Sequence, residues 1–440
     1  MKYANQISEI INAFMPEALK TEQMEKFYCN DTMEYRTGDK YSSPIEDILE
    51  ICQNQARQNV RNAFLLLGHQ GCGKSTELNR MSEDFISNGY PVKTVVCSLD
   101  LDLLNISNSD LFILMGEALL KIAEESKCEI NEKTLDSIMR FWDEGMEITA
   151  SQELQAATIE SGISAGTSSI LFHLLDVFTK IKADLKFNEE TRKEYRKKIS
   201  NRSSEWIDLL NHVSNEISGK TGGKFPIIIF EDLDKLNPED AWKIFDNYAA
   251  SLSGMKFPVI YTFPIGLSYD SRFYAMENYF IIKILPMIKI EKIDGGKFPE
   301  GIAIIRKIVE KRTNPDLFDS DVLDKMIRFT GGSLRDLFYV INASASRAVR
   351  RKSQTISMED ADRALEELKT SLTRRIERKD YNFLLNICNG NREVIEDKKI
   401  LLNMLETSVV LEYNGKRWHN VHPLVQQFFK DQGLIEDVTE

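Results

Sequence analysis

Five short and mostly apolar runs interrupt a chain that otherwise shows mostly helical periodicity. The runs are Ala63–Leu67, Pro91–Leu99, Pro226–Phe230, Pro258–Phe263 and Phe280–Leu285. Apolar runs that do not alternate with polar residues are typical of strands covered on both faces. The first run is followed by a glycine-rich loop, a helical pattern and the second run, and this order builds parallel sheets. The sequence therefore predicts an α/β fold around a parallel sheet.

The segments between these runs predict helices. Residues 1–45 are polar and mixed, with a helix expected at Ala4–Phe14 and a turn at Thr37-Gly38-Asp39. Another helix begins at Pro44, since proline suits the first helical position. Residues from about 105 to 223 are too many for one crossover helix. We expect a mostly helical insertion there, with helices at Ser109–Glu125, Ile170–Asp184 and Glu190–Ile217 and a loop or small hairpin at Thr158–Ser169.

After Lys289 the pattern changes to consecutive helices, expected at Gly301–Arg312, Asp319–Thr330, Ser333–Lys352 and Met358–Thr370. The last segment shows helices, then two strand-like runs around Asn414-Gly415, a signal for a hairpin with a type I′ turn. Helix, helix, hairpin, helix is the order of a winged helix. We therefore expect an N-terminal segment (1–45), an α/β core (46–290, with the insertion at about 105–223), a helical lid (291–372) and a winged-helix-like domain (373–440).

Composition narrows the class of protein. A length of 440 residues favours two or three domains. The longest apolar runs are too short to cross a membrane, and the first residues lack the apolar stretch of a signal peptide. Six scattered cysteines without a CxxC pair indicate reduced thiols, and the histidines show no metal-site spacing. We expect a cytoplasmic protein without a membrane partner, and a net charge of −12 argues against a surface that coats nucleic acid.

The loop after the first apolar run carries the most specific chemistry. Gly68-His69-Gln70-Gly71-Cys72-Gly73-Lys74-Ser75 fits GxxxxGK[ST] completely, and Thr76 follows. The glycines let backbone N–H groups turn inward around an anion, and the next helix presents its N-terminus to the phosphates. Lys74 is expected on the β- and γ-phosphates and Ser75 on Mg²⁺. The motif predicts ATP or ADP together with Mg²⁺ as ligands.

Three carboxylates follow the third apolar run: Glu231, Asp232 and Asp234. An NTPase of this kind needs one carboxylate to hold Mg²⁺ and, for hydrolysis, another to orient the attacking water. By register, Glu231 takes the metal side and Asp232 the catalytic water. The aspartate more usually comes first, so the reverse assignment stays open, and so does a simple acidic cap for the helix that starts after Asn237.

These motifs resemble the AAA+ and STAND groups of P-loop NTPases, and in particular bacterial ATP-binding proteins of the origin-recognition type. The resemblance rests on GHQGCGKST, IIIFEDLDKLNPEDA, FPVIYTFPIGL, GGSLRDL and VHPLV, in this order. It implies that Thr262 is a polar "sensor 1" residue, where asparagine is commoner, and that Arg335 is the "sensor 2" arginine on the γ-phosphate. It also implies that His422 touches the nucleotide, although Pro423 replaces the expected aspartate. The alternatives are an exposed helix arginine for Arg335 and a helix cap for His422.

Other basic residues have several interpretations. An arginine finger from a neighbouring subunit would stabilise the transition state, with Arg272, Arg306 and Arg312 as candidates. The basic clusters at 192–202 and 347–352, together with Lys416 and Arg417 on the expected wing, suit DNA binding, but such clusters are more often solvated helix faces.

The sequence therefore favours an ATPase that uses Mg-ATP binding and slow or partner-stimulated hydrolysis as a conformational or assembly switch. The resemblance implies a bacterial regulatory or defence setting, with a homo-oligomer or a protein partner. Two alternatives remain: an ATP-dependent DNA-binding protein acting through its winged helix, and a partner-binding scaffold with vestigial hydrolysis.

Overall fold

The five apolar runs form one parallel sheet. The computed structural model describes residues 1–30, 32–37, 43–54, 62–143, 167–392, 397–413 and 418–435. In this part of the chain the large sheet has five strands in the order β2-β3-β4-β1-β5, all parallel. The strands are β1 (Ala63–Leu67), β2 (Val92–Val96), β3 (Ile227–Glu231), β4 (Val259–Phe263) and β5 (Ile281–Ile284). The predicted α/β class and the five strands are confirmed.

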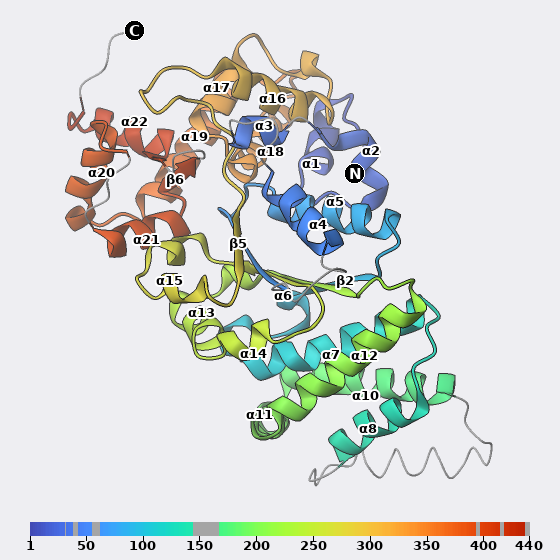
Figure 1. Cartoon of the computed structure of the whole chain (residues 1–440). Coiled ribbons are helices and arrows are strands. Elements are labelled where there is room, and N and C mark those ends of the chain that lie inside the picture. The colour runs from blue at the N-terminus through green and yellow to red at the C-terminus, as the bar shows by residue number, and fades with distance from the viewer. Residues whose placement is uncertain are drawn as a thin grey trace.

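Successive side chains of the central strands enter two different hydrophobic layers, as the pleat requires. Leu65 and Phe230 belong to the cluster that continues into the helices between β2 and β3. Phe64 and Ile229 belong to a second cluster, together with the helices next to β1. The sheet is therefore buried on both faces (Figure 1), which explains its apolar runs without alternation.

One layer contains the helices on either side of β1. They are α4 (Pro44–Asn54) and α5 (Lys74–Ser87). The other layer contains the predicted insertion and the helices after β3. These are α6 (Cys97–Asp100), α7 (Asn108–Glu125), α8 (Glu132–Asp143), α10 (Thr167–Phe187), α11 (Glu189–Asn201), α12 (Ser203–Lys220), α13 (Pro238–Phe245), α14 (Ala249–Ser253) and α15 (Phe273–Met276).

The insertion is helical, as expected, but it is continuous with the core. Helix α7 contacts β2, and its side chains share one hydrophobic cluster with the sheet. The pattern that predicted one helix at 190–217 forms two, α11 and α12, which meet at Arg202. No helix was predicted over α8. Of the predicted loop at 158–169, residues 158–166 lie outside the described part of the chain.

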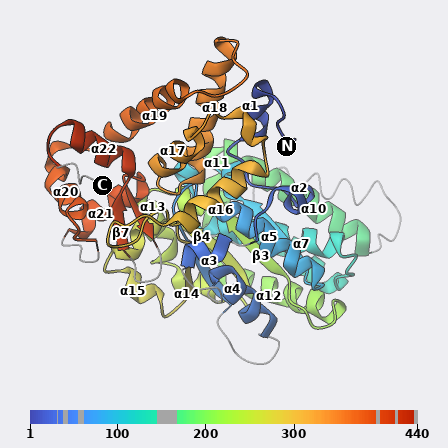
Figure 2. The ribbon, with the colours of Figure 1, turned by 90° about the horizontal axis from the view of Figure 1, so that it is seen from above.

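The lid helices lie together on one side of the sheet, and the C-terminal elements pack beside them (Figures 1 and 2). The lid comprises α16 (Pro299–Glu310), α17 (Val322–Phe329), α18 (Leu334–Arg350) and α19 (Met358–Thr373). The C-terminal part comprises α20 (Tyr381–Cys388), α21 (Lys398–Glu406), the antiparallel strands β6 (Val410–Tyr413) and β7 (Trp418–Val421), and α22 (Pro423–Asp431). This is the predicted helix, helix, hairpin, helix order. Residues of both parts share one hydrophobic cluster.

The N-terminal segment folds against the lid and α5. It contains α1 (Ile10–Ala13), α2 (Thr21–Phe27) and α3 (Thr32–Thr37), whereas only a helix over 4–14 was predicted. Helix α1 contacts α18, α2 contacts α5, and α3 contacts α16. Short 3-10 turns complete the fold. They are η1 (Ile7–Glu9), η3 (Leu103–Asn105), η4 (Leu233–Lys235), η5 (Ile265–Tyr269), η6 (Pro315–Leu317) and η7 (Arg378–Asp380).

None of the described helices combines the length and the apolar character needed to cross a membrane. Gly38 and Asp39 of the predicted turn, and the predicted hairpin turn at Asn414-Gly415, lie outside the described residues.

Candidate functional site

The phosphate loop connects β1 to α5 and opens into a cavity of about 780 Å³. Gly71 and Gly73 have φ angles of +84° and +101°, a region that glycine adopts without strain. A Cβ atom at Gly71 would lie 2.4 Å from the Cβ of Arg335. The glycines therefore give the loop its turned backbone and let the lid approach it closely. The α5 N-terminus begins at Lys74, as the motif requires.

Lys74 is buried, and all three donors of its ammonium group are used. It donates to the carbonyl oxygens of Gly68 at 2.6 Å and His69 at 2.9 Å, and it forms an ion pair with Asp234 at 2.8 Å. Burial acts to lower the pKa of Lys74, but the neighbouring Asp234 outweighs it, so the pKa is raised and the group stays charged. The loop therefore holds a fixed cation at the N-terminus of α5.

Glu231 is the last residue of β3. It therefore lies at the same edge of the sheet as the phosphate loop, which follows the parallel strand β1. It is buried, and burial raises its pKa to about 7, although a hydrogen bond from Ser75 acts in the opposite direction. The structure thus brings together the hydroxyl and the carboxylate that the sequence assigned to the metal. Hydroxyl and carboxylate oxygens are the ligands that Mg²⁺ prefers, with phosphate oxygens and water completing the shell.

Asp232 follows Glu231 with a left-handed backbone, at φ +70°. One carboxylate oxygen accepts a hydrogen bond from Ser98, which follows β2, and the other pairs with Lys235 at 2.6 Å. Asp232 and these two partners line the same cavity as Lys74 and Glu231. The carboxylate that the sequence assigned to the catalytic water is therefore in the cavity, but it is engaged by two neighbours.

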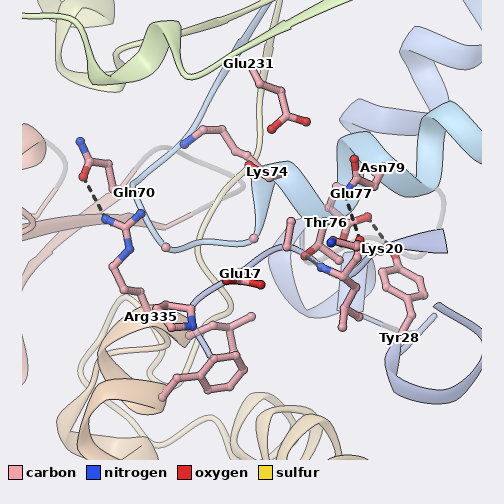
Figure 3. Close-up of a pocket in the computed structure, with 18 of the residues that line it drawn as sticks. Glu17, Lys20, Tyr28, Gln70, Lys74, Thr76, Glu77, Asn79, Glu231 and Arg335 are labelled. Atoms are coloured by element: carbon pink, nitrogen blue, oxygen red, sulfur yellow. Dashed lines mark hydrogen bonds between the residues drawn. The ribbon is translucent and has the colours of Figure 1, made fainter. Parts of the chain in front are cut away.

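Arg335 lies on the first turn of α18 and reaches over the phosphate loop from the lid (Figure 3). Its guanidinium donates to the side-chain oxygen of Gln70 at 2.9 Å, although the two residues are far apart in sequence. The preceding glycines explain this position, since Gly331 and Gly332 have positive φ angles and Ser333 caps the helix. The predicted lid arginine is thus in contact with the loop.

Thr262 lies in β4, next to β3, and faces the turn that carries the carboxylates. Its hydroxyl accepts hydrogen bonds from the backbone N–H groups of Leu233 at 3.0 Å and Asp234 at 3.4 Å, and it donates to the carbonyl oxygen of Phe230. It is buried and does not line the cavity. Thr262 therefore fixes the shape of the turn after β3, and its assignment as the sensor 1 residue stays a prediction.

The two histidines of the predicted site contact the C-terminal part. The buried His69 of the phosphate loop accepts a hydrogen bond at 2.8 Å on Nε2 from the backbone N–H of Glu412 in β6. Burial lowers the pKa of His69 to about 3, so the ring is neutral at physiological pH. His422 caps α22 by accepting from the N–H of Leu424, and its Nε2 lies 3.6 Å from Asp336. His422 does not line the cavity, and its position is that of the helix cap.

The wall of the cavity opposite the sheet comes from the N-terminal segment, for which no site residue was predicted. Thr76 accepts from the N–H of Leu19, Asn79 donates to the carbonyl oxygen of Leu19, and Tyr28 donates to Glu77 at 2.8 Å (Figure 3). Apolar side chains of this segment and of the lid complete the wall. They are Leu19, Phe27, Ile308, Leu334 and Phe338.

Two buried arginines also line the cavity, and the described residues offer neither of them a carboxylate partner. Arg36 donates to the carbonyl oxygen of Pro286 and lies beside Gly73, where a Cβ atom would be 3.3 Å from its Nη2. Arg312 stacks on Phe338 and donates to Ala13, and burial lowers its pKa to about 10. No local motif marks Arg36. With Lys74 and Arg335, these arginines bring positive charge into a cavity that carboxylates also line.

The structure places the three arginine-finger candidates in different surroundings. Arg312 lines the cavity of its own chain. Arg272 pairs with Asp270 and stacks on Trp242, and Arg306 pairs with Asp324. Arg312 is therefore a residue of the site itself, and the assignment of a finger stays a prediction.

The basic clusters are largely paired with acids. Arg196 pairs with Asp110, Arg347 with Glu367 and Arg351 with Asp360, and the guanidinium of the buried Arg192 donates to Leu185. Lys416 and Arg417 of the expected wing lie outside the described residues. No group of three or more metal-ligating side chains occurs in the described part of the chain. Ser75 and Glu231 alone would therefore need oxygens of a bound phosphate to complete a Mg²⁺ site.

No protein-family model matches the chain, and no curated protein matches it. Among solved structures it is similar to the ORC2 protein of Aeropyrum pernix in ADPNP–ADP complexes (TM-score 0.42, 10% identity, 99% of this chain and 100% of that one). It is also similar to the ORC1 protein of the same organism in complex with DNA (0.38, 12%, 88% and 92%). A third is the RuvB Holliday junction branch migration motor of Thermotoga maritima (0.36, 10%, 91% and 98%).

Proposed function

We propose that this protein binds Mg-ATP in the cavity beside the phosphate loop and hydrolyses it slowly, as a switch that couples the lid and the C-terminal part to the nucleotide. The observation that carries the proposal is the meeting of Lys74, Ser75 and Glu231 in one cavity. Lys74 and Ser75 begin the helix after β1, Glu231 ends β3, and β4 lies between these two strands. These three groups are what a phosphate and its magnesium ion require at the N-terminus of a helix.

Each residue has a defined role in this proposal. Lys74 and the loop amides hold the phosphates, and Ser75 and Glu231 hold Mg²⁺. The Ser75 contact supports Glu231 on the metal side, which leaves Asp232 to accept a proton from the attacking water. Arg335 and the buried Arg36 and Arg312 add positive charge from the lid and the N-terminal segment. Mg²⁺, when bound, supplies charge neutralisation between the β- and γ-phosphates.

The contacts around the loop support a switch. The residues that line the cavity come from the N-terminal segment, the core and the lid, and the C-terminal hairpin contacts His69 of the same loop. A nucleotide would therefore touch groups from the N-terminal segment, the core and the lid, and it would bind a loop that also contacts the C-terminal hairpin. Asp232 is engaged by Ser98 and Lys235, so we expect slow hydrolysis that a second copy or a protein partner accelerates by releasing it.

Isothermal titration with ATP and ADP, together with phosphate release, tests this proposal. Lys74→Ala should abolish nucleotide binding, because the phosphates lose their central cation, and Lys243→Ala on the exposed face of α13 is the matched control. Asp232→Asn should keep ATP affinity within about twofold and lose turnover by at least ~100-fold. Unchanged ATP affinity in Lys74→Ala would refute the proposal. If Glu231→Gln loses turnover and Asp232→Asn does not, the roles of the two acids are exchanged.

Two further measurements separate the alternatives. Mass in solution with ADP and with ATP tests an assembly switch. A DNA shift assay at several salt concentrations, with and without ATP, tests the winged helix, since DNA contacts give a steep salt dependence. In this structure α21, which precedes the hairpin, packs against η5 of the core. Tight, salt-dependent DNA binding with no change of assembly would favour the DNA-binding function instead.

A further inference from the structure

The third carboxylate of the turn after β3, Asp234, has no role in the proposed reaction, yet it is buried and bound to the central cation of the site. Its Oδ2 lies 2.8 Å from Nζ of Lys74, and it is 7% exposed. The other two acids of the same turn have other partners, since Glu231 meets Ser75 and Asp232 meets Ser98 and Lys235.

We propose that Asp234 stands in for a phosphate group in the nucleotide-free protein, and that it limits nucleotide affinity by competing for Lys74. This inference rests on the proposed function, because it assigns Lys74 to the phosphates.

The competition follows from counting donors. An ammonium group has three N–H donors, and Lys74 uses them on Asp234 and on the carbonyl oxygens of Gly68 and His69. A phosphate oxygen therefore gains a hydrogen bond from Lys74 only when one of these contacts ends. The two carbonyls belong to the loop itself. Asp234 is the only anion of the three, and a phosphate beside it would be repelled.

Asp234 is also poorly placed to follow Lys74 or to find another cation. Thr262 accepts hydrogen bonds from the backbone N–H groups of Leu233 and Asp234, which fixes the turn. Among the described residues, Lys74 is its one ion-pair partner. Its negative neighbours are Glu231 and Glu406, whose pKa values it helps to raise. A nucleotide that takes Lys74 therefore leaves a buried carboxylate unpaired, and this cost is subtracted from the binding energy.

The test measures affinity of the full-length protein for ADP and for inorganic pyrophosphate, in EDTA, by isothermal titration. Asp234→Asn keeps the size of the side chain and removes the charge, so both ligands should bind about tenfold more tightly than to the wild type. Asp234→Glu keeps the charge and should not gain affinity. Asp240→Asn, the same change on the exposed face of α13, is the matched control.

Unchanged or weaker binding of both ligands to Asp234→Asn would overturn the inference, because Asp234 would then be a structural group or a ligand aid. Pyrophosphate needs only the loop. If Asp234→Asn binds pyrophosphate more tightly than the wild type does, and the wild type binds no ADP, the inference is supported and the proposed nucleotide function is refuted.

Thermal unfolding of the ligand-free Lys74→Met, Asp234→Asn and double variants gives a readout that needs no ligand. Removing both partners should lower the midpoint less than the sum of the single changes, since each single change leaves one buried partner alone. Additive shifts would also overturn the inference.

Discussion

At the scale of single residues, the lysine, hydroxyl and carboxylate groups of the candidate site contact one another. Lys74 pairs with Asp234, Ser75 with Glu231, and Asp232 with Ser98 and Lys235. Buried polar and charged groups are costly unless they are paired, so these contacts stabilise the ligand-free fold. They also mean that binding and hydrolysis must replace existing contacts one by one.

Ser98 gives a direct test of this view. Ser98→Ala removes the hydrogen bond to Asp232 and frees one carboxylate oxygen to accept a proton from water. We expect ATP turnover to rise about threefold, with ATP affinity unchanged within twofold, as measured by phosphate release and titration. A fall in turnover would show instead that Ser98 orients Asp232 productively. Ser137→Ala, on the exposed face of α8, is the control.

At the scale of elements, helix α21 of the C-terminal part carries a half-buried carboxyl group, that of Glu406, against the core. Glu406 accepts a hydrogen bond from the backbone N–H of Gly266, and a Cβ atom at Gly266 would lie 2.7 Å from the carbonyl oxygen of Leu402. Burial, with a contribution from Asp234, raises the pKa of Glu406 to about 7. The contact between α21 and η5 is thus close and sensitive to charge.

This contact should make stability depend on pH. The folded protein keeps the Glu406 proton up to about pH 7, whereas the unfolded chain loses it near 4.5. The contribution of Glu406 to folding stability therefore falls as the pH rises through this range. Glu406→Gln should match the wild type at pH 5 and exceed it by about 2 kcal/mol at pH 8, a rise of a few degrees in Tm.

Glu239→Gln, an exposed change on α13, is the control for that comparison. An equal difference between Glu406→Gln and the wild type at both pH values would contradict the assigned cause, because a gain that is independent of pH cannot come from the carboxyl proton.

An element could be predicted from the sequence where a short contiguous stretch of residues determines it. The strands β1, β3 and β4 are continuous apolar runs, and the phosphate loop is a contiguous motif, so both could be read from the sequence. The wall made by Leu19 and Tyr28 could not, because it depends on contacts with Thr76 and Glu77 about 50 residues away. Arg36 likewise becomes a site residue only through its distant contact with Pro286. Thr262 and His422 occupy the predicted elements, but their side chains are taken up by a turn and a helix cap.

At the scale of the whole molecule, the phosphate loop lies between the core and the C-terminal hairpin. Glu412 donates to His69, and Tyr413 donates to the carbonyl oxygen of Gly331 at 2.6 Å, next to the helix that carries Arg335. Cys72 of the loop shares a hydrophobic cluster with Leu411, Tyr413 and Trp418. The loop is therefore in contact with the C-terminal part, which the proposed switch would move.

His69→Ala tests whether this contact holds the hairpin in place. The substitution leaves the buried N–H of Glu412 without its acceptor, at a cost of about 1–3 kcal/mol. Amide hydrogen exchange over 410–413 and 418–421 should accelerate, and Gln70→Ala, which removes only the contact with Arg335, should leave it unchanged. The effect should be the same at pH 5 and pH 8, since the His69 ring is neutral at both. Exchange that stays as slow as in the wild type would show that other contacts suffice.

The hairpin also supplies an optical reporter. The chain has four tryptophans, and Trp418 is the one in the C-terminal part. Its ring stacks on Tyr413 at 4.6 Å, lies near the guanidinium of Arg392 and is 4% exposed. A variant in which phenylalanine replaces Trp142, Trp206 and Trp242 would emit from this position alone. A shift of its emission to longer wavelength would then signal that the hairpin has left the phosphate loop, in real time and without an attached dye.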